Sequence, residues 1–133
     1  ATFVKRTQGF LREPDEEYDW ANYTRLQVPI HPDTLEPLQA LLARTAGQGV
    51  HVLLVRGPVP AMAADARARA EHAVNAEFFR KLASSAPTIH LAEPYLRVLP
   101  TAAFGTPSHP KLPAAQANSR WLAELVKPLL TRR

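Results

Sequence analysis

A helical pattern followed by a continuous apolar run stands out between residues 33 and 60. Asp33 can accept a hydrogen bond from a free N–H group of the first helical turn, and Glu36 completes a capping-box pair. The sequence therefore predicts that a helix begins at Asp33. Gly47 and Gly49 tolerate the positive φ with which many helices end. The apolar positions of this helix recur at helical spacing: Leu35, Leu38, Leu41 and Leu42.

The next segment, Val50 to Val55, reads VHVLLV and predicts a strand that is apolar on both faces. Such a strand is typical of a parallel sheet covered by helices. Residues 88–91 predict a second strand, and residues 62–84 between the two predict a long helix. Its core-facing stripe is predicted from a four-residue repeat: Ala66, Ala70, Val74, Phe78 and Leu82. This alternation favours an α/β fold with a mainly parallel sheet.

The whole chain, residues 1–133, is predicted to form a single α/β domain, with an irregular N-terminal segment at 1–32 and an α-β-α-β-α core at 33–133. Residues 101–112 predict a loop. A last helix is expected from about Pro113 towards Leu130, with Pro128 kinking or fraying its final turns. Its predicted buried stripe is Trp121, Leu122, Leu125, Val126 and Leu129. Three aromatic residues are expected to hold the N-terminal segment against the domain: Tyr18, Trp20 and Tyr23.

Ligands of parallel α/β sheets bind beyond the carboxyl ends of the strands. Arg56 and Gly57 follow the first predicted strand, and Glu93 follows the second. These three residues are therefore candidates for substrate binding at one edge of the sheet.

Composition excludes several classes of site. The chain has no cysteine, which excludes disulfides, thiolate metal sites and a cysteine nucleophile. The five histidines show no spacing that would place two ligands on one helical face, so neither a metal site nor a cofactor is expected. The net charge is +4, but acidic and basic residues are interspersed, which argues against a nucleic-acid surface. No apolar run approaches the roughly 20 residues that span a membrane, and the cellular compartment stays open.

Residues 105–114, GTPSHPKLPA, precede the last predicted helix and resemble the last conserved block of SGNH (GDSL) hydrolases, D-x-x-H-P-N-x-x-G. His109 and Pro110 match that block. The leucine-rich helix, VHVLLVRGPVP and TIHLAEP also resemble the helix–strand–helix–strand portion of these flavodoxin-like folds, including relatives in cell-surface polysaccharide acetylation. The resemblance extends from about Asp33 to the C-terminus. It implies a three-layer, flavodoxin-like domain and a carbohydrate esterase or O-acyltransferase activity on an acylated carbohydrate.

In that family the histidine is the general base that deprotonates a serine, and an aspartate three residues before it orients the imidazole. The resemblance therefore implies that His109 is the candidate base. This chain has Thr106 where the family has the aspartate, Lys111 in place of its asparagine and Ala114 in place of its glycine. A threonine cannot supply the negative charge that stabilises an imidazolium.

The family's N-terminal G-D-S nucleophile block is absent from this chain. None of the four serines is predicted on a glycine-flanked strand-to-helix turn: Ser84, Ser85, Ser108 and Ser119. Ser108 adjoins His109, and neighbouring residues rarely present their side chains in the geometry of nucleophile and base. Glu93 could replace the missing aspartate, although a solvent-facing carboxylate is the expected arrangement there.

Two interpretations follow from these departures. Either the chain is the C-terminal part of a longer SGNH-like protein, with an incomplete sheet and a missing N-terminal half, or it is a degenerate homologue that kept the scaffold and lost the reaction. In both, the isolated chain is incomplete or inactive. The alternative function is a non-catalytic interaction or assembly domain that binds a protein partner through its N-terminal aromatic residues and its last helix.

Overall fold

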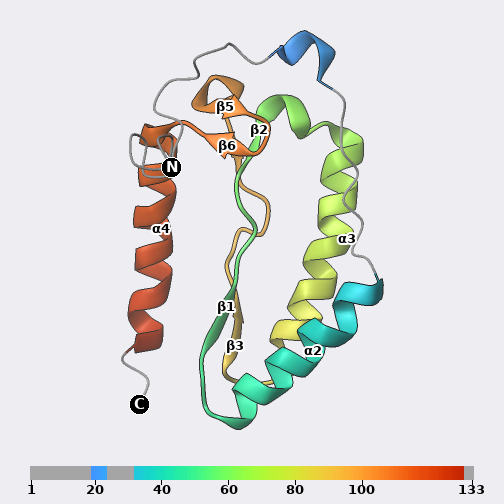
Figure 1. The fold of residues 1–133 in the computed structure, drawn as a ribbon, viewed down its shortest axis with the longest axis vertical. Coiled ribbons are helices and arrows are strands. Elements are labelled where there is room, and N and C mark those ends of the chain that lie inside the picture. The colour runs from blue at the N-terminus through green and yellow to red at the C-terminus, as the bar shows by residue number, and fades with distance from the viewer. Residues whose placement is uncertain (1–18, 24–31, 131–133) are drawn as a thin grey trace, which may run out of the picture. The chain divides into compact units, whose positions relative to one another are not determined.

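The computed structural model describes residues 19–23 and 32–130 (Figure 1). Within this part of the chain it is an α/β protein whose small sheets are mostly parallel. The described residues fall into two compact units. One unit holds residues 32–57 and 66–97, and the other holds 19–23, 58–65 and 98–130. Most of the irregular segment predicted at 1–32, including Tyr18, lies outside the described residues.

The unit at 32–57 and 66–97 contains α2 (Pro32–Gly47), β1 (Val52–Leu54), α3 (Ala66–Ala83) and β3 (Ile89–Leu91). Strands β1 and β3 pair in parallel, with Val52 opposite Ile89 and Leu54 opposite Leu91 (Figure 1). The predicted order of helix, strand, helix and strand is therefore confirmed, as is the parallel direction of these two strands. The helix predicted from Met62 begins instead at Ala66.

Helix α2 ends as its glycines predict. Gly49 has a φ of 70°, which a residue with a side chain rarely adopts. Its N–H donates to the carbonyl of Ala46 at 3.0 Å, and the N–H of Val50 donates to Thr45 at 2.9 Å. These bonds satisfy carbonyl groups of the last helical turn and direct the chain into β1.

A buried cluster of Leu42 from α2, Leu82 from α3 and Ile89 from β3 forms the core of this unit. Around it pack partly buried residues from the same elements and the segment that follows α3: Leu38, Val52, Leu54, Phe78, Phe79, Ala83 and Ala86. The side chains of Val52, Leu54 and Ile89 therefore point to the face of the β1–β3 pair that the two helices cover. Burial of this apolar surface is the main source of the unit's stability.

Part of the predicted core is wrong. Leu41 is 57% exposed while its neighbour Leu42 is 3% exposed, and Val74 is 71% exposed. A helix turns by 100° per residue, so a strict four-residue repeat rotates by about 40° at each step and leaves a single face within a few turns. The buried positions of α3 are accordingly Ala68, Ala76 and Leu82, and Ala66 and Ala70 are exposed.

The first strand is also less buried than its composition predicts. Val50 and Val55 are exposed, and all three residues of β1 are only partly buried. The reason is that, within the described part of its unit, β1 has the single neighbour β3, and the helices α2 and α3 pack on one face of the pair. An apolar run shows that a segment can be buried, but the elements that cover the segment decide what fraction of its surface is buried.

The unit at 19–23, 58–65 and 98–130 begins with the short 3₁₀ helix η1 (Trp20–Asn22). It contains the parallel pair β2 (Val59–Pro60) and β4 (Val98–Leu99), each followed by a 3₁₀ turn, η2 (Ala61–Ala63) and η3 (Thr101–Ala103). The N–H of Met62 donates to the hydroxyl of Thr101 at 3.1 Å and so joins the two turns. Val59, Pro60 and Phe104 are buried in this unit.

The loop predicted at 101–112 is instead largely a hairpin. Strand β5 (Phe104–Thr106) pairs antiparallel with β6 (His109–Pro110), and α4 (Leu112–Leu130) follows directly (Figure 1). The N–H of Lys111 donates to the carbonyl of Ala103 at 2.8 Å, which closes the hairpin just before the helix. Pro107 in the turn and Pro110 in β6 hid this pairing from sequence analysis, because proline normally argues against a strand.

Helix α4 begins one residue before the predicted Pro113 and continues through Pro128 to Leu130. Its predicted stripe, from Trp121 to Leu129, is only partly buried, and Ala115 is its one fully buried residue. Within residues 19–23 and 32–130, no helix combines the length and the apolar character that crossing a bilayer requires.

The two adjacent leucines of α2 test the observed core. We expect Leu42→Ala to lower the free energy of unfolding by about 2–5 kcal/mol, because it leaves a cavity between α2, α3 and β3. Leu41→Ala, the matched control at an exposed site, should change it by about 0.5 kcal/mol or less. Urea denaturation of both variants measures the difference. Equal losses would show that the helix is rotated relative to the arrangement described.

Candidate functional site

The predicted site residues belong to different units. Arg56, Gly57 and Glu93 lie in the unit that contains β1 and β3, whereas His109 lies in the unit that contains α4.

Arg56 and Glu93 leave the same edge of the β1–β3 pair. The last residues of the two strands, Leu54 and Leu91, lie opposite one another, and the N–H of Ala92 donates to the carbonyl of Leu54 at 2.9 Å. Arg56 stands two residues beyond β1, and Glu93 stands two residues beyond β3. The parallel register thus brings these two loops together at the carboxyl edge, where parallel α/β sheets bind ligands.

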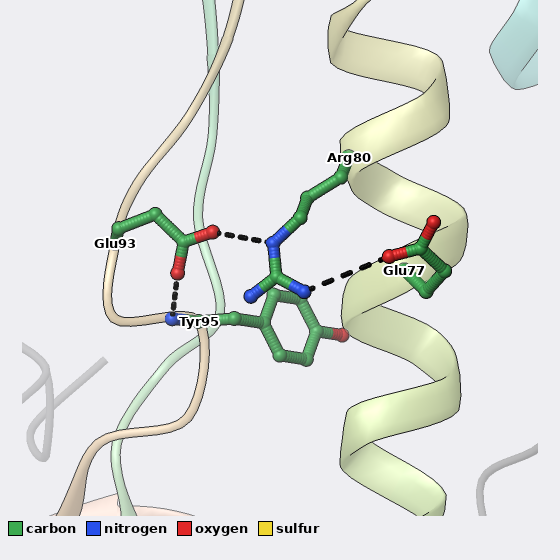
Figure 2. A network of polar contacts seen from close by, with 4 residues as sticks. All are labelled: Glu77, Arg80, Glu93 and Tyr95. Carbon is green, nitrogen blue, oxygen red and sulfur yellow. Dashed lines mark hydrogen bonds and ion pairs between the residues drawn. The ribbon is translucent and has the colours of Figure 1, made fainter.

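The Glu93 carboxylate holds its loop to α3 (Figure 2). Its Oε1 accepts a hydrogen bond from Arg80 Nε at 2.8 Å, and its Oε2 accepts one from the N–H of Tyr95, also at 2.8 Å. Arg80 also forms an ion pair with Glu77, in which its Nη1 lies 3.8 Å from Oε2 of Glu77. The Glu93 side chain remains 48% exposed, so the expected solvent-facing carboxylate is exposed and also partnered.

These contacts set the protonation of the pair. The hydrogen bond from Arg80 lowers the pKa of Glu93, and burial opposes that shift only in part. The same hydrogen bond raises the pKa of Arg80. A carboxylate stabilised in its charged form is a weak general base. Glu93 is therefore suited to hold the loop rather than to take a proton from a substrate.

Tyr95 is a buried residue next to this ion pair. It is 7% exposed and stacks on Phe79, with 5.8 Å between ring centroids and 25° between ring planes. Burial raises the pKa of its hydroxyl, and the positive charge of Arg56 acts in the opposite direction. The Tyr95 hydroxyl is thus neutral at physiological pH. Arg56 lies close enough for its charge to act on that hydroxyl. Of the predicted edge residues, half-buried Arg56 is the best placed to attract an anionic group.

His109 lies in β6 at the end of the hairpin and is exposed. Its Nδ1 lies 2.9 Å from the hydroxyl oxygen of Thr106 and 2.9 Å from that of Ser108. The tight turn between β5 and β6 brings both hydroxyls to one ring nitrogen. Adjacent Ser108 and His109 therefore come within hydrogen-bonding distance, but through Nδ1, which the orienting residue uses, and not in the arrangement of nucleophile and base. Both contacts use Nδ1, so Nε2 is the nitrogen that can serve a further reactant.

Sequence analysis did not predict a second histidine contact, between His51 and His90. The two rings meet across β1 and β3, with Nδ1 of His51 2.9 Å from Nε2 of His90. A parallel alignment of the two predicted strands would have placed them on the same face. Among the described residues, no group of three or more histidine or carboxylate side chains is arranged to hold a metal ion.

Comparisons with known proteins identify no relative: no family model, no curated protein and no solved structure matches the chain.

The ion pair at the sheet edge gives a prediction with a defined pH dependence. Glu93→Gln should lower the free energy of unfolding by about 1 kcal/mol or less at neutral pH, because exposed ion pairs contribute little. Glu93 has a lowered pKa in the folded state, so its contribution is present above its ordinary value of 4.5 and is lost as the pH falls through the lowered value. Urea denaturation in neutral and in acidic buffer measures both effects.

Glu77→Gln is the matched control, since its 3.8 Å contact with Arg80 is longer than that of Glu93. We expect it to have the smaller effect at neutral pH. A difference between Glu93→Gln and the unmodified chain that persists or grows in strong acid would contradict the assigned ion pair.

Proposed function

We propose that this chain is an SGNH-hydrolase-like domain related to carbohydrate esterases and O-acyltransferases, with His109 in the place of the catalytic base. One observation carries the proposal. In the family motif an aspartate three residues before the histidine orients the ring, and here Thr106, at that same spacing, lies 2.9 Å from Nδ1 of His109. This contact supports the proposal, because it lets Thr106 hold the ring as the aspartate does in the family, although the carboxylate is absent.

In such a base the two ring nitrogens have different roles. A partner at Nδ1 holds the imidazole in one orientation, and Nε2 takes the proton from a serine or from water as it attacks the ester carbonyl. Thr106 can orient the ring through a hydrogen bond, but it carries no charge to stabilise the imidazolium that forms. Catalysis by His109 is weakened accordingly.

The serines of this chain do not complete the reaction. Ser108 contacts Nδ1, the nitrogen that the orienting residue uses, and Ser119 donates to the carbonyl of Ala115 within α4. Ser84 and Ser85 donate to carbonyls at the end of α3. The proposal therefore places the nucleophile in another part of a longer protein, or treats the domain as one that has lost the serine reaction.

The order of α2, β1, α3 and β3, and the parallel pairing of the two strands, are compatible with part of a flavodoxin-like sheet. In the proposal, further strands and a third layer complete that sheet. The open situation of β1, which has only β3 beside it in the part of the chain described, supports this interpretation.

A non-catalytic interaction domain is the second candidate, and α4 favours it. The apolar stripe of α4 is only partly buried, and Leu130 is 72% exposed. A helix with an apolar side that its own unit does not cover is a common element of protein interfaces. Trp20 and Tyr23, the other predicted contact residues in the described part, pack on each other with 6.3 Å between ring centroids.

Because no serine of this chain serves His109, the catalytic proposal predicts only a weak esterase activity of the isolated chain, in which His109 activates water, and this activity should improve with a carboxylate. The full chain is assayed with 4-nitrophenyl acetate and with an acetylated oligosaccharide. His109→Gln should reduce hydrolysis to the buffer rate. Thr106→Asp should raise it about tenfold or more, since loss of the orienting carboxylate costs Ser-His-Asp enzymes about 10⁴ in kcat.

Thr106→Val is the matched control, because it keeps the shape of threonine and removes only the hydroxyl that reaches Nδ1. It should reduce the rate below that of the unmodified chain. Hydrolysis that is unchanged in His109→Gln would remove His109 from the proposed role and leave the interaction domain as the better candidate.

A further inference from the structure

Arg56 stands just beyond β1 as a partly buried cation without an acidic partner in the described part of the chain. Within residues 19–23 and 32–130, its guanidinium takes part in no ion pair and no hydrogen bond. Its charge stays close to the unit: burial raises the pKa of the Tyr95 hydroxyl, and the positive charge of Arg56 partly opposes that shift. Partial burial of an unpaired cation is unfavourable, and an anion bound beside it would offset that cost.

The carboxylate that the fold brings to the same edge is committed elsewhere. The register ends β1 and β3 side by side, so Glu93 leaves on the loop next to that of Arg56. Both oxygens of Glu93 are engaged, one by Arg80 and the other by the N–H of Tyr95, each at 2.8 Å (Figure 2). Arg80 also pairs with Glu77. Of these four charged side chains, Arg56 is therefore the one that the other three do not neutralise.

The residue after Arg56 offers both room and a hydrogen-bond donor. Gly57 is exposed, and a methyl group added at its α-carbon would meet no atom within 4 Å. Within the described part of the chain, its N–H donates to no backbone carbonyl. A guanidinium and a backbone N–H can both donate to one anion. This open space lies beyond the carboxyl end of β1, where parallel α/β sheets bind ligands.

The charge at this edge favours a carboxylate over a phosphate. The planar fork of an arginine matches the two oxygens of a carboxylate, and one arginine balances its single negative charge. A phosphate dianion would keep a negative charge close to Glu93, whose side chain is 48% exposed, and like charges repel. Among the charged side chains just described, no second unpaired cation stands ready to balance it.

We propose that the loop after β1 binds the carboxylate of a small organic acid, with the Arg56 guanidinium as the main donor and the Gly57 N–H as the second. Binding is reversible, and no covalent bond forms or breaks. The site belongs to the unit of β1 and β3, whereas His109 belongs to the other unit. It does not rest on the proposed esterase function.

The test is a titration of the ¹⁵N-labelled full chain with acetate at neutral pH and constant ionic strength, followed by NMR. We expect saturable shifts of the Arg56 Nε signal and of the Gly57 amide signal. Arg56→Gln should weaken binding by about tenfold or more, as reported by the Gly57 amide, because charge-assisted hydrogen bonds are the strong ones. Arg56→Lys should also weaken it, since lysine keeps the charge but lacks the fork.

Arg44→Gln is the matched control. It removes the same charge from an exposed arginine in the last turn of α2, which precedes β1, and should leave acetate binding unchanged. Circular dichroism checks the fold of each variant. Arg56→Lys keeps the carbon stem of the side chain and is the variant that should fold in any case.

Three outcomes would overturn the proposal. The first is a shift that does not saturate, or that saturates equally in the unmodified chain and in both Arg56 variants. The second is equal weakening by Arg44→Gln, which would show that only the net charge of the chain matters. The third is tighter binding of inorganic phosphate than of acetate at the same ionic strength, which would assign the site to a different anion.

Discussion

The parallel register between β1 and β3 is the constraint on which most features of its unit depend. It directs Val52, Leu54 and Ile89 into the core with α2 and α3. The same register directs His51 and His90 to the opposite face, where their rings meet. It also ends the two strands side by side, so that the loops carrying Arg56 and Glu93 leave from one edge. A shift by one residue would exchange the two faces and separate these groups.

Sequence analysis predicted the elements of this unit well, because their signals are local. Gly49 marks the end of α2 by its positive φ, and the apolar runs mark the two strands. It predicted the extent of burial poorly. Leu41 and Leu42 are chemically identical, and only the rotation of the helix against its neighbours decides which of them is buried. The strand at residues 52–54 is apolar throughout, yet one face of it lacks a covering helix in the described part of its unit.

In the candidate sites, too, contacts between residues close in the sequence were predictable and contacts between distant residues were not. Thr106, Ser108 and His109 lie within four residues of each other, so a motif could single them out and a hairpin brings them together. The partners of Glu93 and of His90 are not local. Arg80 reaches Glu93 across 13 residues, and His51 reaches His90 across 39. These contacts depend on how α3 and β1 lie beside β3, and only a correct alignment of the two predicted strands would have indicated the histidine contact.

The register can be measured directly in solution through scalar couplings across hydrogen bonds in the NMR spectrum. The account predicts a coupling from the amide nitrogen of Val52 to the carbonyl carbon of Thr88, and another from Ala92 to Leu54, because both bonds are 2.9 Å long. Coupling of Val52 to the carbonyl of Pro87 or Ile89 instead would contradict the register. It would also remove the basis for the shared edge and for the histidine pair.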